Sequence, residues 1–230
     1  KGWNLSLQVL DGILCHDGEL HSQALRPDKE KDFSALDAEM KEKMENPSKD
    51  IWPMTLEGCV VRMSDTISYI GRDIEDAIRL RLIRREDIPE DCSRVLGVTN
   101  GSIVYTLVED LVANSLEKPY VCFSDEVGEA LKRLKEFNQS RIYQNEAFWK
   151  QTPKIHLMFK LLFEKYVQDL ETDCLGSDIF VEFLEGMSSD YRDNTSHAGI
   201  VRDFIAGMTD AYFLGQCQKQ LIPQMKSIRF

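Results

Sequence analysis

The chain has 230 residues, of which 43% are hydrophobic and 29% are charged, and its formal net charge at pH 7 is -11. This length suits one large domain or two small ones, and the composition is that of a folded protein, not a disordered one. The acidic balance disfavours wholesale wrapping of nucleic acid. No apolar run approaches the roughly 20 residues that a bilayer span needs, so we expect no membrane crossing.

The cysteines and the first residues bear on the cellular compartment. The six cysteines are scattered without a C-x-x-C pair, which favours free thiols in a reducing cytoplasm over a zinc site or a disulfide framework. Asn4, Ser6 and Gln8 interrupt the first apolar stretch, so a signal peptide is not expected. The chain starts with Lys1 instead of Met, which indicates a piece of a longer protein. We therefore expect a cytoplasmic protein fragment.

Helical patterns follow one another along the chain. Residues 3–14 form a mostly apolar run, and residues 26–50 predict a solvated helix with a narrow apolar seam. Further helices are expected over residues 55–83, 102–114, 124–143, from Pro153 onward, 179–187 and 199–220. The only obvious strand-like run, residues 120–123, is too short to build a sheet. The prediction is an all-α fold.

The helix expected over residues 55–83 carries the most informative pattern. At about 100° per residue, one side gathers apolar residues that should face the core: Leu56, Val60, Met63, Ile67, Ile70, Ile74 and Ile78. On the other side Asp65, Tyr69 and Asp73 stack at i, i+4 and i+8, with Arg62 and Asp76 close beside them. A solvated outer face is the default explanation of such charges. The tyrosine within the stripe, Tyr69, hints at a functional role, because a phenol is better used against a base, a sugar or the core than in water.

Residues 64–77 resemble the D-x-I-x-Y-x-x-x-D-x-x-D-A segment of deoxyguanosine triphosphate triphosphohydrolases, which belong to the HD superfamily of metal-dependent phosphohydrolases. Residues 4–14 resemble the helix that follows the catalytic region of that family, and residues 123–143 are similar to a later segment. Residues 201–210, with Asp203 to Asp210, look like its D-[YF]-I-A-G-M-T-D signature. Four matches in the same order are more specific than any one of them.

The resemblance implies an all-α, HD-domain-like helical bundle. Residues 1–230 would be a single all-helical region, with residues 1–115 as the end of the HD catalytic core and residues 116–230 as a C-terminal helical subdomain. Asp65 would be the last ligand of a divalent metal ion, Mg²⁺, Mn²⁺ or similar. Tyr69 would pack on the nucleotide sugar and base, and Asp73 would accept a hydrogen bond from the 3′-hydroxyl. A metal-activated water would then attack the α-phosphate of dGTP or another dNTP, releasing deoxynucleoside and triphosphate.

The chain departs from the family pattern because the other ligands and the catalytic His and Glu are expected upstream of Lys1. The doublet His16-Asp17 is not a substitute, since it lies at a predicted helix end beside Gly18, where His16 should contact helix carbonyls. Glu19 and His21 are expected on the surface. His156 and His197 also have explanations in packing and capping. The fragment alone is therefore expected to be inactive.

Partners and rival functions follow from the same comparison. The family implies homo-oligomers, hexamers included. The arginines at positions 79, 81, 84 and 85 complement a helix C-terminus, and contact with phosphate, single-stranded DNA or another subunit is the alternative. The rival to an enzyme is a non-catalytic helical regulatory or interaction module on an HD scaffold. A third possibility is an HD phosphohydrolase that acts on monophosphates.

Overall fold

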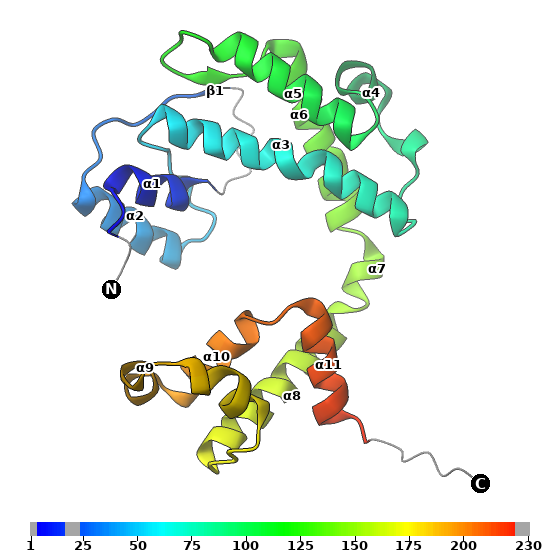
Figure 1. Cartoon of the computed structure of the whole chain (residues 1–230). Coiled ribbons are helices and arrows are strands. Elements are labelled where there is room, and N and C mark those ends of the chain that lie inside the picture. The colour runs from blue at the N-terminus through cyan, green and yellow to red at the C-terminus, as the bar shows by residue number, and fades with distance from the viewer. Residues whose placement is uncertain (1–3, 17–23, 224–230) are drawn as a thin grey trace. The chain divides into compact units, whose positions relative to one another are not determined.

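The computed structural model describes residues 4–16 and 24–223 (Figure 1). In these ranges the chain forms eleven α-helices, a few short 3-10 and π turns, and one small antiparallel ladder. The all-α prediction is confirmed. The chain divides into two compact units, with the boundary between Asn145 and Glu146. The predicted end of the catalytic core at residue 115 stays a prediction.

Unit 1 is built around one long helix. Its helices are α1 (Leu7–Cys15), α2 (Phe33–Glu45), α3 (Leu56–Arg79), α4 (Glu90–Leu96), α5 (Asn100–Ser115) and α6 (Asp125–Asn138). A 3-10 turn covers Arg85–Asp87, and a π turn, Gln139–Tyr143, follows α6 directly. The strand β1 (Ala24–Leu25) pairs antiparallel with β2 (Val121–Cys122), so the strand-like run does join a ladder, one of two residue pairs.

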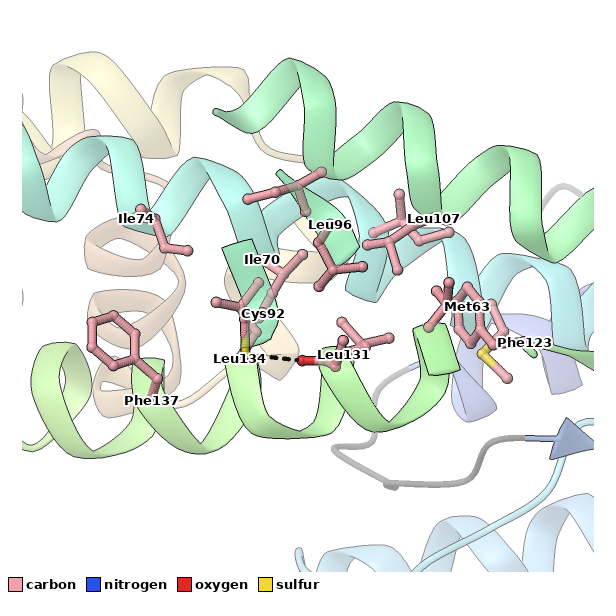
Figure 2. Close-up of a cluster of buried hydrophobic side chains, with 14 of the residues drawn as sticks. Met63, Ile70, Ile74, Cys92, Leu96, Leu107, Phe123, Leu131, Leu134 and Phe137 are labelled. Atoms are coloured by element: carbon pink, nitrogen blue, oxygen red, sulfur yellow. Dashed lines mark hydrogen bonds between the residues drawn. The ribbon is translucent and has the colours of Figure 1, made fainter. Parts of the chain in front are cut away.

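The core of unit 1 lies between α3 and the helices α4, α5 and α6. Figure 2 shows Met63, Ile70 and Ile74 of α3 in one cluster with Leu107 of α5 and Leu134 of α6. The four central residues of the predicted core face, Met63, Ile67, Ile70 and Ile74, are all buried. Contiguous burial of this kind supplies most of the free energy that holds such helices together.

The two ends of α3 differ from the sequence expectation. Val60 is 45% exposed, so its assignment to the core is wrong, and Leu56 and Ile78 are only partly buried. Near its start α3 packs against α1 and buries Cys59 instead. A single stripe cannot describe a 24-residue helix whose neighbours change along its length.

One capping residue and one glycine fix the position of α3. Thr55 Oγ1 accepts a hydrogen bond from the Gly58 amide at 3.0 Å and begins the helix. In the middle of α3, a Cβ on Gly71 would lie 2.8 Å from Asn100 Oδ1 and 3.1 Å from its Cα. The close approach of α3 and α5 therefore requires a glycine at this position.

Unit 2 contains α7 (Glu146–Trp149), α8 (Thr152–Glu171), α9 (Ser189–Asn194), α10 (His197–Ala206) and α11 (Asp210–Leu221). A π turn, Ile179–Phe183, and a 3-10 turn, Leu184–Gly186, stand where the sequence predicted a helix over residues 179–187. The core gathers Leu162 and Tyr166 of α8 with Phe204 of α10 and Phe213 of α11. The Tyr166 hydroxyl donates to Gln216 Oε1 at 2.7 Å inside this core.

Two predicted helices have different bounds because capping residues interrupt them. The single helix expected over residues 199–220 is wrong: α10 ends at Ala206, and Thr209 caps α11 by accepting from the Tyr212 amide at 3.3 Å. The helix expected from residue 26 begins only at Phe33, where Asp32 Oδ1 accepts from the Ala35 amide at 2.8 Å. Short polar side chains at these points favour a new helix start over continuation.

In the described ranges no single helix has both the length and the apolar character to span a bilayer. Only α4 and α5 taken together, which are bent by 65° relative to each other, reach that length and apolar composition.

Candidate functional site

The predicted stripe of α3 is present as one face of the helix. Asp65, Tyr69 and Asp73 are each half-buried and follow one another along α3 at four-residue intervals. At 1.5 Å per residue, Asp65 and Asp73 are separated by roughly 12 Å along the helix axis. One helix thus presents two carboxylates with an aromatic ring between them.

A cavity of about 200 Å³ lies beside this stripe, between α3 and the end of α6. Its walls are made of Tyr69 and Ile70 from α3, and of Lys135, Glu136, Asn138, Gln139, Ser140, Tyr143 and Gln144. Of the three predicted site residues, Tyr69 lines this cavity, whereas Asp65 and Asp73 are not among its lining residues. The cavity is therefore lined by aromatic residues and by polar side chains that include both hydrogen-bond donors and hydrogen-bond acceptors.

Tyr143 is a candidate site residue that the sequence did not assign. Its hydroxyl donates a hydrogen bond to Asp73 Oδ2, so the π turn at the end of α6 is joined to the α3 stripe. Asp73 Oδ1 has no hydrogen-bond partner among the described residues and remains able to accept one. A continuous α-helical periodicity does not predict this contact, because the π turn shifts the direction of the last side chains.

Two further side chains of α6 connect the cavity wall to α3. Lys135 Nζ donates to Thr66 Oγ1 at 3.3 Å. Asn138 Nδ2 donates to the main-chain carbonyl of Ile70 at 3.0 Å. These contacts hold the two helices in register around the cavity.

The carboxylate of Asp65 is open. The main-chain carbonyl of Asp65 accepts from Ser68 Oγ at 2.7 Å, but its carboxylate has no hydrogen bond or ion pair within residues 4–16 and 24–223. Asp65 belongs to no cluster of three or more His, Cys, Asp or Glu side chains within these ranges. A half-buried carboxylate without a partner suits a hard divalent cation, provided that other ligands come from outside the described residues.

Arg62 does not belong to the stripe, and its placement beside Asp65 is wrong. It is only 3% exposed, and its guanidinium donates to the carbonyl of Ile51 at 2.6 Å and lies 6.0 Å from the ring centre of Trp52. The connector before α3, together with α1, covers this side of the helix, which a helical projection cannot foresee. Asp76 does lie on the surface, where it pairs with Arg79 at 3.1 Å.

The predicted basic run is largely paired with acidic neighbours. Besides the Arg79 pair, Arg84 contacts Asp87 at 3.2 Å, and Arg85 contacts Glu75 at 2.8 Å. The hydrogen bond from Arg85 is the main cause that lowers the pKa of Glu75 below its usual range. Within the described chain, three of the four arginines thus form ion pairs with acidic side chains. A role of this run in binding single-stranded DNA stays a prediction.

One group of possible metal ligands lies away from the stripe, and a lysine already occupies it. Asp11, Cys15 and Glu39 come close together, but Lys31 Nζ lies 3.1 Å from Asp11 Oδ1 and 2.8 Å from Glu39 Oε2. Burial raises the pKa of the Cys15 thiol to about 12, so it stays protonated. Burial opposes the charge of Lys31, yet its hydrogen bonds with Glu39 and Asp11 prevail and raise its pKa. The group is an ammonium site that joins α1 to α2.

The predictions for His16 and His197 agree with local structure, whereas His156, expected to be a partly exposed packing residue, is exposed. His16 Nδ1 lies 2.7 Å from the carbonyl of Ile13, as expected for a residue that ends a helix. Asp17, Gly18, Glu19 and His21 lie outside the described residues. Ser196 caps α10 just before His197 by accepting from the Gly199 amide at 3.2 Å.

The comparisons with known proteins concern both halves of the chain. A family model described as "Phosphohydrolase-associated domain" matches residues 121–219. A "Deoxyguanosinetriphosphate triphosphohydrolase-like protein" of Caldanaerobacter subterraneus subsp. tengcongensis is 34% identical over 97% of this chain and 53% of its own length. Proteins with the same name are 30% identical in Clostridium perfringens, over 97% of this chain and 56% of the relative, and 31% identical in Clostridium tetani, over 93% and 52%. The chain spans about half the length of the curated relatives that it matches.

Proposed function

The chain belongs to the HD-superfamily family of deoxyguanosinetriphosphate triphosphohydrolase-like proteins, and we propose that the full-length protein hydrolyses dGTP or another dNTP to deoxynucleoside and triphosphate. In this proposal the described chain binds the sugar and supplies one metal ligand. The remaining ligands and the groups that move protons come from the part of the protein outside this chain.

The observation that carries the proposal is the joining of Asp73 to Tyr143 next to Tyr69. Because Tyr143 donates to one carboxylate oxygen, Asp73 is held with its other oxygen available to accept a hydroxyl hydrogen bond. The ring of Tyr69 lines the adjoining cavity and offers a face on which a sugar or a base can pack. A carboxylate acceptor beside an aromatic face suits a deoxyribose with a free 3′-hydroxyl.

Asp65 fits the role of a divalent-metal ligand, because its carboxylate is open and lies two helical turns from Asp73. When bound, a Mg²⁺ or Mn²⁺ ion would supply Lewis-acid activation of water and neutralise phosphate charge. With Asp73 on the sugar and Asp65 toward the phosphates, the spacing of roughly 12 Å along α3 orients the nucleotide along the helix.

The proposal is tested with the full-length protein, dGTP and Mg²⁺ or Mn²⁺, by resolving triphosphate from phosphate and pyrophosphate. Asp65→Ala should abolish triphosphate release, and Asp73→Asn should raise KM for dGTP and lower kcat/KM by about tenfold or more, the size of one charged hydrogen bond. Asp76→Asn, on the exposed side of the same helix, is the matched control and should leave release unchanged. Release that survives Asp65→Ala, or a product other than triphosphate, would contradict the proposal.

One observation favours a second candidate, a non-catalytic regulatory or interaction module. Within the described ranges Asp65 belongs to no cluster of three or more metal-ligating side chains, so these residues alone do not complete a metal site around it. The same assay separates the two candidates. A full-length protein that releases nothing from any dNTP with either metal, while it still binds a nucleotide, would favour the regulatory module.

We further propose a homo-oligomer, and α5 supports it. This helix buries Ile103, Leu107 and Leu111, yet its opposite side exposes Tyr105, Val108 and Val112, and Leu116 just after its end is exposed as well. Large apolar side chains gathered on the exposed side of a helix are typical of a contact surface. Val112→Glu should lower the mass of the full-length assembly in light scattering, whereas an unchanged mass would exclude this face as the subunit contact.

A further inference from the structure

A groove of about 750 Å³ lies between α1 and the first turns of α3. Its lining includes Val9, Gly12 and Ile13 of α1, and Gly58 and Val61 of α3. The large apolar side chains among them, Val9, Ile13 and Val61, are 47%, 58% and 49% exposed. Large apolar side chains gathered around one groove are typical of a contact surface. The residues that the structure describes therefore leave an apolar docking surface on unit 1.

Two glycines line the groove at the place where α1 and α3 approach each other. A Cβ on Gly58 would lie 3.8 Å from Gly12 Cα, so the two helices come close together here. A Cβ on Gly12 would meet no other part of the described chain within 4 Å, which leaves room above this residue for a side chain of another segment. An apolar groove between two helices suits an amphipathic helix whose apolar side chains point into it.

The groove leads along α3 to the candidate site. Val61 precedes Asp65 by four residues, and Asp65 precedes Tyr69 by four, so the three side chains lie on one face of the helix. Each step of four residues covers roughly 6 Å along the helix axis. A segment that fills the groove therefore lies next to Asp65, whose carboxylate is open.

Three observations identify what fills the groove. The chain spans about half the length of the curated relatives that it matches. Asp65 belongs to no cluster of three or more metal-ligating side chains in the described ranges. The helix α1 is the first element of the described chain and forms one wall of the groove, so a segment that precedes α1 in the protein enters beside it. A second copy fits less well, because a two-fold contact would place the same groove on both sides, and two hollow surfaces do not fill each other.

We propose that the groove between α1 and α3 binds an apolar helical segment of the part of the protein that precedes Lys1, and that this contact brings further metal ligands to Asp65. The second half of this inference rests on the proposed function, in which Asp65 is a metal ligand. The first half rests on the exposed groove alone. The segment should carry large apolar side chains three and four residues apart on the side that faces Gly12.

Photo-crosslinking in the full-length protein tests the contact. Benzoylphenylalanine takes the place of Ile13, and after irradiation the crosslinked peptides are identified by mass spectrometry. The crosslink should join α1 to residues that precede Lys1, in a band at the mass of one chain on a denaturing gel. Benzoylphenylalanine in place of Met44, which lies on α2 and is 83% exposed, is the matched control and should give no such crosslink.

Position 9 lines the same groove and replaces position 13 if that variant does not fold. A band at the mass of two chains would mean that a second copy fills the groove, and it overturns the inference. A crosslink confined to residues 1–230 of the same chain, or none from either position, overturns it as well.

Binding of Mn²⁺ to the full-length protein, followed by electron paramagnetic resonance, tests the link to Asp65. The relevant site is the one that Asp65→Ala removes. Ile13→Glu should weaken binding at this site by about tenfold or more, because a carboxylate at a contact that excludes water must be desolvated. Met44→Glu is the control and should leave it unchanged, and Val61→Glu serves if Ile13→Glu does not fold. Unchanged Mn²⁺ affinity in a folded groove variant overturns the link.

Failure of the proposed function is recognisable separately, because neither experiment uses a substrate. That failure is the absence of triphosphate release from every dNTP, and it leaves the expected crosslink in place. A protein that releases triphosphate and gives no crosslink would instead overturn the groove contact alone.

Discussion

Replacing Lys31 with methionine removes the positive charge from the centre of a buried cluster and keeps much of the side-chain volume. The ammonium contacts Asp11 Oδ1 at 3.1 Å and Glu39 Oε2 at 2.8 Å, and it also donates to the main-chain carbonyl of Trp52. The side chains of Lys31 and Asp11 are only 4% and 1% exposed. Water therefore cannot replace the lost partner without local opening of unit 1.

The magnitude follows from the burial of Asp11. Removing one partner of a buried ion pair costs about 3–5 kcal/mol, because a charge is left unpaired in a poorly solvated site. The carboxylate keeps two donors, the Met54 amide at 2.7 Å from Oδ2 and the weaker Cys15 thiol at 3.6 Å from Oδ1, which favours the lower end of this range. At about 2–4 °C per kcal/mol for a unit of this size, Lys31→Met should lower the melting temperature by about 10 °C.

Hydrogen–deuterium exchange in a urea series measures this change, because it reads the amides of α1, α2 and α3 separately from those of unit 2. Only the unit 1 amides should lose protection, since the two units have separate cores. Adding Asp11→Asn to Lys31→Met should recover part of the loss by removing the unpaired charge. Lys49→Met is the control: its pair with Glu42 has side chains 47% and 52% exposed, and no measurable change is expected.

Two results would refute this reasoning. A loss below about 1 kcal/mol for Lys31→Met would mean that the cluster is solvated in solution. Stabilisation of wild-type unit 1 by Zn²⁺ or Mn²⁺, absent in Asp11→Asn, would mean that Asp11, Cys15 and Glu39 bind a metal ion instead of the lysine.

Three further substitutions test other parts of the structure. Glu75→Gln removes the negative charge that pairs with Arg85. Because this pairing lowers the pKa of Glu75, the stabilisation from the charged pair is full above the usual glutamate pKa of about 4.3 and is lost as pH falls through the lowered pKa. Wild type should thus exceed the variant in urea midpoint at pH 7 and match it in acid, and an equal gap at both pH values would contradict this. Tyr166→Phe leaves the buried Gln216 Oε1 without its donor and should cost unit 2 about 1–3 kcal/mol in the exchange experiment; loss of protection in unit 1 would argue against it. Leu107→Ala empties a fully buried site between α3 and α5 and should cost unit 1 about 2–5 kcal/mol, while Met44→Ala, at a side chain of α2 that is 83% exposed, should cost little; similar costs would show that burial does not set the difference.

Local patterns in the sequence determined much of this protein. The 3.6-residue period of α3 identified Met63, Ile67, Ile70 and Ile74 as core residues and put Asp65, Tyr69 and Asp73 on one face, as the structure has them. The start of α6 at Ser124 and the turn at His16 were also predicted from residue type. These features depend on neighbours within about one or two helical turns, and this is the range that a periodicity or a cap encodes.

Tertiary structure alone decided which distant side chains meet. Tyr143 reaches Asp73 across 70 positions, and Lys31 reaches Asp11 across 20, while Arg62 turns from the expected stripe to the carbonyl of Ile51. Each contact depends on how whole helices pack, and the π turn that brings Tyr143 to α3 interrupts the helical period itself. A sequence pattern repeats along one element, whereas a binding cavity is made where two elements meet. For this reason the stripe on α3 was predictable and the cavity beside it was not.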